Sequence, residues 1–521
     1  MGGGPQLADP ILTRLVAEDR VSWYSKPNLR ILYVLLFFAC MGIELTSGFD
    51  SQLINALQIT PTWIKFFNNP QGSLKGIISA AYSLGAILSL PFIPMVNDAW
   101  GRRGSIMAGS WVMVLGAIIQ GCSVNVGMYI VARMILGFGI PTCIVSASSL
   151  IGELGYPKER PVLTSLFNVS FFFGQVMAAG IAFGTNNMKS NWGWKIPSFL
   201  QMVPSLIQII VIYMLPESPR WLISKDRSEE AEAILVKYHS EGHVDSEFIK
   251  AEMSQIVTTL ELEKEASKSS WMDLVATSGM RRRVIISTAL GLFTQFSGNT
   301  LISYYFGDLL KGVGITDPIT IQKMNLGNSC WSLVNAFIVS ILVPKFRRRT
   351  MYMACTISSL LCYTAWTIAM ARAQDAKKAG GRDQAANIAT VVFMFLYSPC
   401  YNIGFNALTY TYMVEVWPYM ERSRGIAIFQ LWGRLAGFFG TFVNPIGLKN
   451  IEWRWLLVYD VFLIFEVIFV YFLFPETSGR TLEELAFLFE DKALAEKANE
   501  AVEEVVHHDE KAGSVTHEKS V

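Results

Sequence analysis

Charged side chains stand inside two long apolar runs of this chain. Asp50 lies in the run containing Gly48-Phe49-Asp50, and Arg133 lies in a later run, ahead of Gly137 and Gly139. Such charges usually face the protein interior and have a partner, because inserting one into lipid costs at least about 2.5–3.5 kcal/mol. An aspartate paired with arginine stays ionised, whereas one separated from it in a dry site favours the protonated acid. The two residues therefore indicate a proton-binding pair; a static ion pair that fastens two helices is the alternative.

Two other apolar runs carry polar side chains at the spacing of one helix face. Asn402, Asn406 and Tyr410 follow at i, i+4 and i+8, and Gln295 and Asn299 repeat at i, i+4. A polar face would be poorly satisfied against lipid, so these faces are expected to line water or a ligand. Amide groups beside aromatic rings suit a neutral ligand with many hydroxyl groups. Hydrogen bonding between packed helices is the alternative.

Other polar residues within the apolar runs have two interpretations each. Arg434 and Gln430 share a helix face, with Glu466 as a candidate counter-ion, and they form either a structural ion pair or a ligand contact. Glu44, six residues before Asp50, falls on another face and is expected near the membrane surface or in a helix contact. A further stripe is assigned equally to interhelical hydrogen bonds or to the ligand: Asn328, Ser332 and Asn335.

The apolar runs that hold these residues are long enough to cross a bilayer. Of the 521 residues, 52% are hydrophobic and only 16% are charged, whereas soluble domains have about 25% charged residues. A hydrocarbon core about 30 Å thick needs about 20 apolar residues per helix. Twelve such windows lie near residues 31–57, 76–97, 105–123, 126–150, 163–184, 196–215, 284–307, 321–343, 351–371, 387–413, 425–446 and 454–474. We therefore predict an all-α membrane protein with twelve transmembrane helices in two six-helix bundles.

The charged segments between and beside the bundles set the domain plan. We predict an N-terminal segment over 1–30, bundles over 31–217 and 284–476, a helical linker over 218–283, and a C-terminal helix with a disordered tail over 477–521. Lys and Arg concentrate in the loops after even-numbered runs, although Lys377, Lys378 and Arg382 lie on the opposite side. By the positive-inside rule, the linker and both termini are expected in the cytoplasm. The first thirty residues contain no cleavable signal peptide.

Charged motifs repeat between the two halves at helix ends. Glu153 precedes Arg160 by seven residues, and Glu415 precedes Arg422 by the same interval. Matched acidic and basic residues can pair across two bundles and close the mouth between them; ordinary interfacial charges are the alternative for any single arginine. The residues assigned to this inner gate are Asp98, Arg102, Arg103, Glu153, Arg160, Glu217, Arg220, Glu415, Arg422 and Glu476.

Several classes of protein are excluded or disfavoured by composition. The net charge of +1 disfavours a nucleic-acid partner. The seven cysteines are scattered singly through apolar runs, so neither a disulfide framework nor a metal site is expected. The sequence contains no nucleophile elbow or P-loop, so we expect no enzymatic activity and no cofactor.

The motifs of the chain resemble those of sugar porters of the major facilitator superfamily, over roughly residues 30 to 490. The resemblance rests on Pro216-Glu217-Ser218-Pro219-Arg220-Trp221-Leu222, on Pro475-Glu476-Thr477-Ser478-Gly479-Arg480-Thr481-Leu482-Glu483-Glu484, on the loop Asp98-Ala99-Trp100-Gly101-Arg102-Arg103, and on Gln295-Phe296-Ser297-Gly298 followed by Tyr304-Tyr305. The segments 406–412 and 442–448 are similar to those of fungal lactose permeases and cellodextrin transporters.

The resemblance implies transport of a sugar across the plasma membrane by alternating access. Proton-coupled porters of this family carry aspartate at the position of Asp50, and facilitative ones carry asparagine, so Asp50 with Arg133 implies symport of sugar with a proton. A facilitator, or a sugar sensor without net flux, are the alternatives. The positions that match the family's sugar contacts, together with the polar faces, are Asn168, Gln295, Asn299, Thr300, Asn402, Asn406 and Tyr410.

Departures from the family pattern bear on the substrate and the gate. Thr294 and Thr300 replace the longer glutamine and asparagine that hexose porters place in the seventh span, which is expected to enlarge the cavity. We therefore expect a β-linked disaccharide resembling lactose or cellobiose, with a hexose or pentose as the alternative. The second gate loop has Pro344 and Arg347 where the first has an acidic residue and a glycine, so the second half of the gate is expected to be looser.

Overall fold

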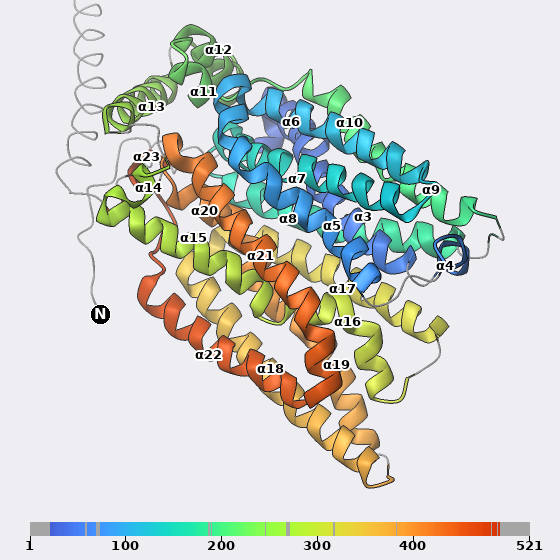
Figure 1. The fold of residues 1–521 in the computed structure, drawn as a ribbon. Helices are drawn as coiled ribbons and strands as arrows, with labels where there is room; N and C mark the ends of the chain where they lie inside the picture. Colours follow the sequence, from blue (N-terminus) through green and yellow to red (C-terminus); the bar gives the residue numbers. More distant parts are fainter. Residues whose placement is uncertain are drawn as a thin grey trace, which may run out of the picture.

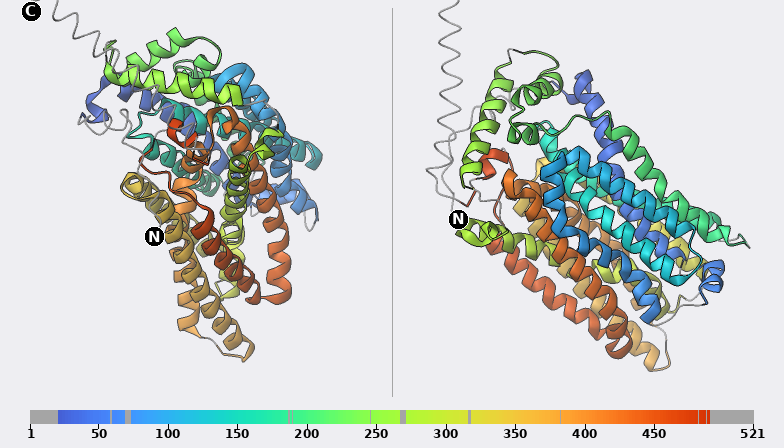
Figure 2. Two further views of the ribbon diagram at one scale, coloured as in Figure 1. Left: turned by 90° about the vertical axis from the view of Figure 1, so that its left-hand side faces the viewer. Right: turned by 45° about the horizontal axis from the view of Figure 1, so that its top comes forward.

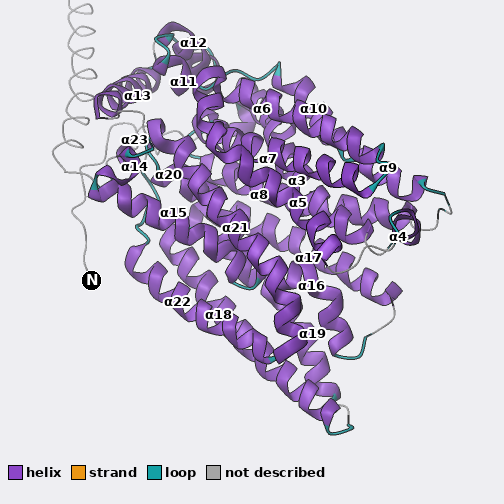
Figure 3. Cartoon of the chain, viewed as in Figure 1, coloured by secondary structure: helices purple, strands orange, loops and turns teal. Residues whose placement is uncertain are grey.

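The computed structural model describes residues 21–489, except 58–59, 69–72, 186–187, 189, 245, 267–270, 316–317, 382, 481 and 487. The expectations for residues 1–20 and for a disordered tail after 490 lie outside the described residues. Within them the chain is helical and contains no strand (Figure 3). The blue-to-teal helices of the first half and the yellow-to-red helices of the second half form two neighbouring groups (Figures 1 and 2).

The first bundle is built from the helices before residue 213. They are α2 (Pro27–Leu36), the π-helical turn η2 (Phe37–Met41), α3 (Gly42–Leu57), α5 (Ser73–Ser89), η3 (Leu90–Phe92), α6 (Ile93–Gly121), α7 (Val126–Leu154), α8 (Arg160–Thr185), α9 (Trp192–Leu200) and α10 (Met202–Ile212). A short helix, α4 (Pro61–Phe66), lies between the first and second spans.

The second bundle repeats the plan after residue 278. Its helices are α15 (Ser278–Phe296), α16 (Asn299–Gly312), α17 (Pro318–Leu342), η4 (Val343–Lys345), α18 (Arg348–Lys378), α19 (Gln384–Tyr401), the π-helical turn η5 (Asn402–Asn406), α20 (Ala407–Val416), α21 (Tyr419–Ile451) and α22 (Arg454–Leu473). The seventh span begins before residue 284, because α15 includes Arg283. Arg283 is buried, and its Nε donates to the Val416 carbonyl (3.0 Å) at the end of α20.

Ten helices of the described residues are long and apolar enough to cross a membrane, and they account for the twelve expected spans. The second and third spans run together through a bend at Gly101 and count as one helix, over residues 77–121. The seventh span is interrupted between α15 and α16, so neither piece qualifies by itself. The prediction of an all-α, twelve-span fold in two bundles is confirmed.

The linker forms a cap of short helices at one end of the molecule, called here the linker side (Figure 1). It contains α11 (Pro219–Ser224), α12 (Ser228–His239), α13 (Glu247–Ala266) and α14 (Asp273–Ala276), and α23 (Leu482–Ala486) lies at the same end. The buried His239 lies 3.2 Å from the Leu154 carbonyl at the end of α7 and 2.8 Å from Glu252. Burial alone would raise the pKa of Glu252, but His239 and nearby arginines hold it below its ordinary value.

Glycines bring the helices of the first bundle into direct backbone contact. A Cβ added at Gly48 of α3 would lie 1.9 Å from the Phe171 carbonyl oxygen of α8. A Cβ at Gly137 of α7 would lie 2.0 Å from the Tyr82 carbonyl oxygen of α5. Small residues permit this close approach, which maximises dispersion contact where no hydrophobic effect acts between helices in lipid. The pairs α3–α8 and α5–α7 are thereby held in fixed register.

Candidate functional site

Asp50 and Arg133 meet in the interior of the first bundle. Asp50 lies on α3 and Arg133 on α7, and their two side chains form paired contacts of 3.3 Å. They are 1% and 2% exposed, so the charges are shielded from water and lipid alike. Gln201, which follows α9, donates from Nε2 to Asp50 Oδ1 at 2.7 Å. Gln201 escaped the sequence analysis; the signal for it was a polar amide between two apolar helices.

The seventh span is broken beside the polar faces of the second bundle. Gly298, between α15 and α16, has φ +103°, and a Cβ there would lie 2.3 Å from the ring of Tyr363. Tyr363 donates its hydroxyl to the Gly298 carbonyl (3.3 Å), and Tyr397 donates to the Ser297 carbonyl (3.2 Å). Tyr401 donates to the Thr294 carbonyl at 3.0 Å. Carbonyls released by the break are thus satisfied within the protein, as a membrane interior requires.

The polar residues of the seventh span lie on both sides of that break. Thr300 donates from its hydroxyl to Gln295 Oε1 at 3.1 Å, which orients the glutamine amide. Gln295 also faces α21, since a Cβ at Gly437 would lie 3.3 Å from Gln295 Oε1. Asn299 accepts at Oδ1 from the Ser303 hydroxyl at 3.1 Å. Gln295 and Asn299 are partly exposed, whereas Thr300 is buried.

The polar face of the tenth span is divided between two environments. Asn402 is buried among α17 and α19, where its Nδ2 donates to the Ser332 carbonyl (3.3 Å) and to Asn335. These partners are those of the interhelical alternative, for Asn402 and for the stripe on α17. Asn406 lies at the end of η5, and its buried Nδ2 has no hydrogen-bond partner among the described residues. Tyr410 accepts from Nε2 of Gln430 on α21.

The two bundles touch along a polar row between α8 and the tenth span. Thr164 and Thr411 share a hydrogen bond of 2.6 Å, and Ser165 donates to the Ala407 carbonyl at 2.6 Å. Asn168 continues the row, donating from Nδ2 to the Asn406 carbonyl at 2.6 Å. The row leads from the linker side toward the unsatisfied Asn406 amide, so Asn168 lies at its inner end.

Glu153 is the centre of the first half of the gate. Arg102 contacts Glu153 at 3.3 Å, and Arg422 reaches it from the other bundle at 2.9 Å. Ser218 donates a hydrogen bond to the same carboxylate, and Arg220 donates to the Glu153 carbonyl at 3.1 Å. Glu153 therefore binds arginines from both bundles, with a serine that the sequence analysis had placed in a motif without a role.

Glu217 fixes the loop that presents the first gate arginine. Its carboxylate accepts from the backbone N–H of Arg102 (3.1 Å) and of Arg103 (3.1 Å). Burial raises the pKa of Glu217 above its ordinary value, although these N–H groups oppose the shift. The guanidinium of Arg103 donates to the Tyr213 carbonyl at 2.9 Å and lies over the Tyr213 ring.

Glu415 repeats this arrangement in the second half. Arg348 contacts Glu415 at 3.1 Å, and Thr477 donates to the same carboxylate at 2.6 Å. Glu476 accepts from the backbone N–H of Arg348 (2.9 Å) and of Arg349 (3.3 Å). Arg348 was not among the residues that the sequence analysis assigned to the gate; the structure makes it the counterpart of Arg102.

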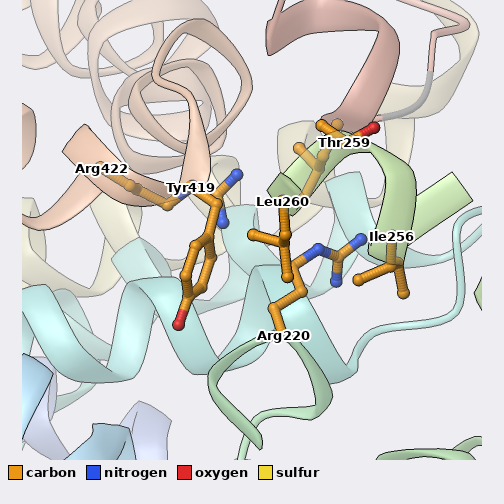
Figure 4. Close-up of a pocket in the computed structure, with 7 residues that line it drawn as sticks. Arg220, Ile256, Thr259, Leu260, Tyr419 and Arg422 are labelled. Carbon is orange, nitrogen blue, oxygen red and sulfur yellow. The ribbon is translucent and has the colours of Figure 1, made fainter. Parts of the chain in front are cut away.

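Tyr419 joins the gate arginines of the two bundles. Its ring centroid lies 4.8 Å from the guanidinium of Arg102 and 5.9 Å from that of Arg422, both within the range of cation–π attraction. A small pocket opens beside it on the linker side (Figure 4). The pocket is lined by Arg220, Ile256, Thr259, Leu260, Tyr419, Arg422 and Leu482.

Two further gate residues face neighbours other than the central carboxylates. Asp98 interacts electrostatically with Arg102 and, across the bundles, with Arg424. Arg160, the sequence counterpart of Arg422, interacts with Glu252 of the linker. Arg160 and Arg422 thus occupy equivalent positions in the two halves of the sequence, but Arg160 interacts with the linker whereas Arg422 binds Glu153.

Arg434 interacts electrostatically with a residue other than the expected one. Glu466 was its candidate counter-ion, but Arg434 interacts with Glu44 of the first bundle. Glu466 is fully buried in the second bundle near Tyr401 and Cys355. The spacing within one helix could not show this, because the partner comes from α3, nearly four hundred residues earlier in the chain.

Comparison with known proteins identifies the family. The family model described as "Sugar (and other) transporter" matches residues 35–489. The chain belongs to the sugar transporter family. It is 26% identical over 505 residues to a high-affinity glucose transporter of Kluyveromyces lactis, with 93% of this chain and 90% of that protein covered. It is also 26% identical to the low-affinity glucose transporter HXT3 of Saccharomyces cerevisiae, with 81% and 74% covered.

A solved structure shows the same fold. The proton:xylose symporter XylE of the major facilitator superfamily, bound to 6-bromo-6-deoxy-D-glucose, is 20% identical with a TM-score of 0.77, covering 90% of this chain and 100% of that one. An inward open form of XylE from E. coli, covering 88% and 100%, has a TM-score of 0.64. This transporter is therefore a multi-pass membrane protein of the major facilitator fold, and its family consists of transporters rather than enzymes.

Proposed function

We propose that this transporter couples the movement of a sugar to that of a proton. The observation that carries the proposal is the buried contact between Asp50 and Arg133 at 3.3 Å. Removing either partner of a buried pair leaves an uncompensated charge, so separation of the two favours a neutral Asp50. Proton uptake by Asp50 can then be linked to the exchange between states that open to opposite sides. The XylE neighbour, named a proton:xylose symporter, supports this reading.

Transport in cells that lack sugar carriers tests the coupling. Uphill accumulation of labelled glucose or cellobiose should fall as external pH rises from about 5 to about 8, and collapse of the proton gradient should abolish it. Asp50→Asn should lose accumulation yet retain part of the downhill exchange, because the amide keeps the shape but cannot bind a proton. Transport that is equal at both pH values and indifferent to the gradient would show a facilitator.

We propose a β-linked disaccharide as the substrate, with the sugar held between the broken seventh span and the tenth span. Gln295 and Asn299 flank the break, and the buried Asn406 amide has an unused donor. The Thr300 hydroxyl donates its hydrogen bond to Gln295, so Thr300 positions the Gln295 amide and does not itself bind the sugar. Asn444, in a segment similar to disaccharide porters, accepts from Trp455 and Tyr459 inside the bundle, and its buried Nδ2, like that of Asn406, has no hydrogen-bond partner among the described residues.

A hexose or pentose is the second candidate, because the similar proteins named above are glucose transporters and a xylose symporter. Competition between sugars separates the two. Cellobiose or lactose should displace labelled substrate at lower concentration than glucose or xylose. Alanine at Gln295 or Asn406 should weaken uptake several-fold, since a lost hydrogen bond is worth about 0.5–1.5 kcal/mol. The reverse order of displacement would make this a monosaccharide carrier.

We also propose that the linker side faces the cytoplasm and that the transporter resides in the plasma membrane. Lysine and arginine in the loops of that side support the orientation. Antibody access to a tag in the loop after Lys378, between α18 and α19, tests the orientation in intact cells. A tag placed after Glu241 in the linker is the matched control and should be accessible only after permeabilisation.

A further inference from the structure

A second group of charges joins the two bundles inside the membrane. Glu44 on α3 is 6% exposed, interacts with Arg434 of α21, and hydrogen-bonds with Tyr410 of α20. Tyr410 accepts in turn from Gln430 of α21. Glu44 belongs to the first bundle and its partners to the second. Unlike Asp50 and Arg133, which share one bundle, this group must come apart when the bundles separate on the linker side.

Tyr82 connects this group to the proton-binding pair. Its ring centroid lies 5.7 Å from the guanidinium of Arg133 and 5.6 Å from that of Arg434. Both distances fall within the range of cation–π attraction, about 6 Å. The backbone contact between Tyr82 and Gly137 fixes the ring relative to α7, and hence to Arg133. A cation from the other bundle is thus held over a ring that moves with the proton-binding pair.

We propose that Tyr82 couples the Asp50–Arg133 pair to the closure of the bundles by holding Arg434 at a position where it attracts Glu44. This inference rests on the proposed proton coupling. While Asp50 is ionised it neutralises Arg133, and Arg434 shares the ring with a compensated cation. When Asp50 binds a proton, Arg133 becomes an uncompensated positive charge beside the same ring as Arg434. The repulsion weakens the electrostatic attraction between Arg434 and Glu44, so the bundles separate more readily on the linker side.

The surroundings of the two carboxylates contain few other ionisable groups. From the neighbouring helices, the titratable or charged residues that interact with Asp50 or Glu44 are Tyr82, Tyr129, Arg133, Tyr410 and Arg434. Of the helices that pack most closely on α3, α8 has a charged residue only at its first position, Arg160 on the linker side, and α10 has none. A pH response of this region is therefore assigned to Asp50 and Glu44.

The gate on the linker side has the same construction one layer away. There the Tyr419 ring lies near both Arg102 of the first bundle and Arg422 of the second, which bind the carboxylate of Glu153. In both layers an aromatic ring is shared by one arginine from each bundle. The inner layer differs in that one of its arginines also binds a candidate proton carrier.

This coupling can be tested without knowing which sugar is carried, by measuring how accessible a buried residue at the interface between the bundles is to a thiol reagent. Ser165 is buried between α8 and the tenth span. Ser165→Cys, with the exposed Cys122 and Cys330 replaced by serine, can be labelled with a fluorescent maleimide in full-length protein in liposomes. Labelling rates at about pH 5 and pH 8 are compared after correction for the thiolate fraction, measured on the same variant unfolded in detergent.

We expect the corrected rate to be several-fold higher at pH 5 in the reporter background. Tyr82→Leu should remove that difference, whereas Tyr82→Phe, which keeps the ring, should retain it. Glu44→Gln should label rapidly at both pH values, because Arg434 has lost its anion. A Tyr82→Leu variant that responds to pH like the parent, while Asp50→Asn does not, overturns the role of Tyr82 and leaves proton coupling standing. If the labelling rate of the parent does not respond to pH, both the role of Tyr82 and the proposed proton coupling are wrong.

The test with Tyr82→Leu requires that this variant is folded. Monodisperse elution in detergent and downhill exchange of labelled glucose or cellobiose establish that the variant is folded. If Tyr82→Leu fails to fold, Arg434→Gln, which leaves the ring in place but removes the second cation, takes its place: it too should lose the pH difference, and a parent-like response in Arg434→Gln overturns the proposal.

Discussion

The two halves of the gate place their arginines in the same way although their loops differ. In the first half, Gly101 turns the chain with φ +74°, and this non-helical residue divides α6 into two segments that meet at a kink. In the second, Arg347 is extended and caps a new helix, α18, after the short turn η4. Even so, Arg102 lies 3.3 Å from Glu153, and Arg348 lies 3.1 Å from Glu415.

The carboxylates that close each half explain this agreement. Glu217 and Glu476 each accept two consecutive backbone N–H groups of the arginine loop. Backbone N–H groups are present whatever the side chains, so this contact tolerates loss of the glycine and of the acidic residue. The expectation of a looser second half therefore finds no support in the distances. The first half differs in that its carboxylates interact with the other bundle: Arg422 binds Glu153, and Arg424 interacts with Asp98.

Neutralising the central glutamates should produce the largest difference between the halves. Glu153→Gln strands Arg102 and Arg422, whereas Glu415→Gln strands Arg348. Breaking a buried ion pair from one side costs about 3–5 kcal/mol. We expect Glu153→Gln to lose at least tenfold in uptake of labelled glucose or cellobiose per surface molecule, and Glu415→Gln to lose less. Equal losses would mean that the contact between bundles adds nothing.

The arginines themselves should separate gating from stability. Arg422→Gln removes a contact between bundles, so we expect a several-fold change in linker-side accessibility, read with the Ser165→Cys reporter, and little change in the thermal unfolding midpoint. Arg348→Gln removes a contact within one bundle and should lower the midpoint instead. The interpretation fails if Arg348→Gln alters accessibility more than Arg422→Gln does.

Truncating the hydroxyl donors should affect the halves equally. Ser218→Ala and Thr477→Ala each remove a hydrogen bond to a buried carboxylate, worth about 1.5–3 kcal/mol. Thermal unfolding of the two purified variants in one detergent compares them, with Ser224→Ala at a half-buried position of α11 as a control. A much larger fall in the unfolding midpoint for one variant would show that the groups around Glu153 and Glu415 are not equivalent.

The smallest effect is expected where the loops differ. Gly101→Ala places a side chain at φ +74° and ψ −178°, a conformation open essentially only to glycine, which costs about 1–3 kcal/mol, and its Cβ would lie 2.5 Å from Glu217 Oε2. Arg347→Ala changes an extended residue and should cost little. Unfolding midpoints of the two variants test this, and a parent-like Gly101→Ala would show that the bend in α6 can relax.

The sequence by itself predicted the membrane class, the twelve spans and the division into halves, because run length and hydropathy are local properties. The repeated glutamates and arginines could be recognised for the same reason, since matched spacing is visible along the chain. Thr477 and Ser218 stood within those motifs, but a hydroxyl has no spacing signature that reveals its acceptor.

Only the tertiary structure decided which charges meet across the bundles. Arg434 interacts with Glu44 instead of Glu466, and the Tyr82 ring lies within cation–π range of both Arg133 and Arg434. In helices that lipid surrounds, apolar patterning does not fix rotation strongly, because lipid and protein interior are similarly apolar. The glycine contacts and the cost of unpaired charge set that rotation instead. Both depend on helices that are distant in sequence and adjacent in space.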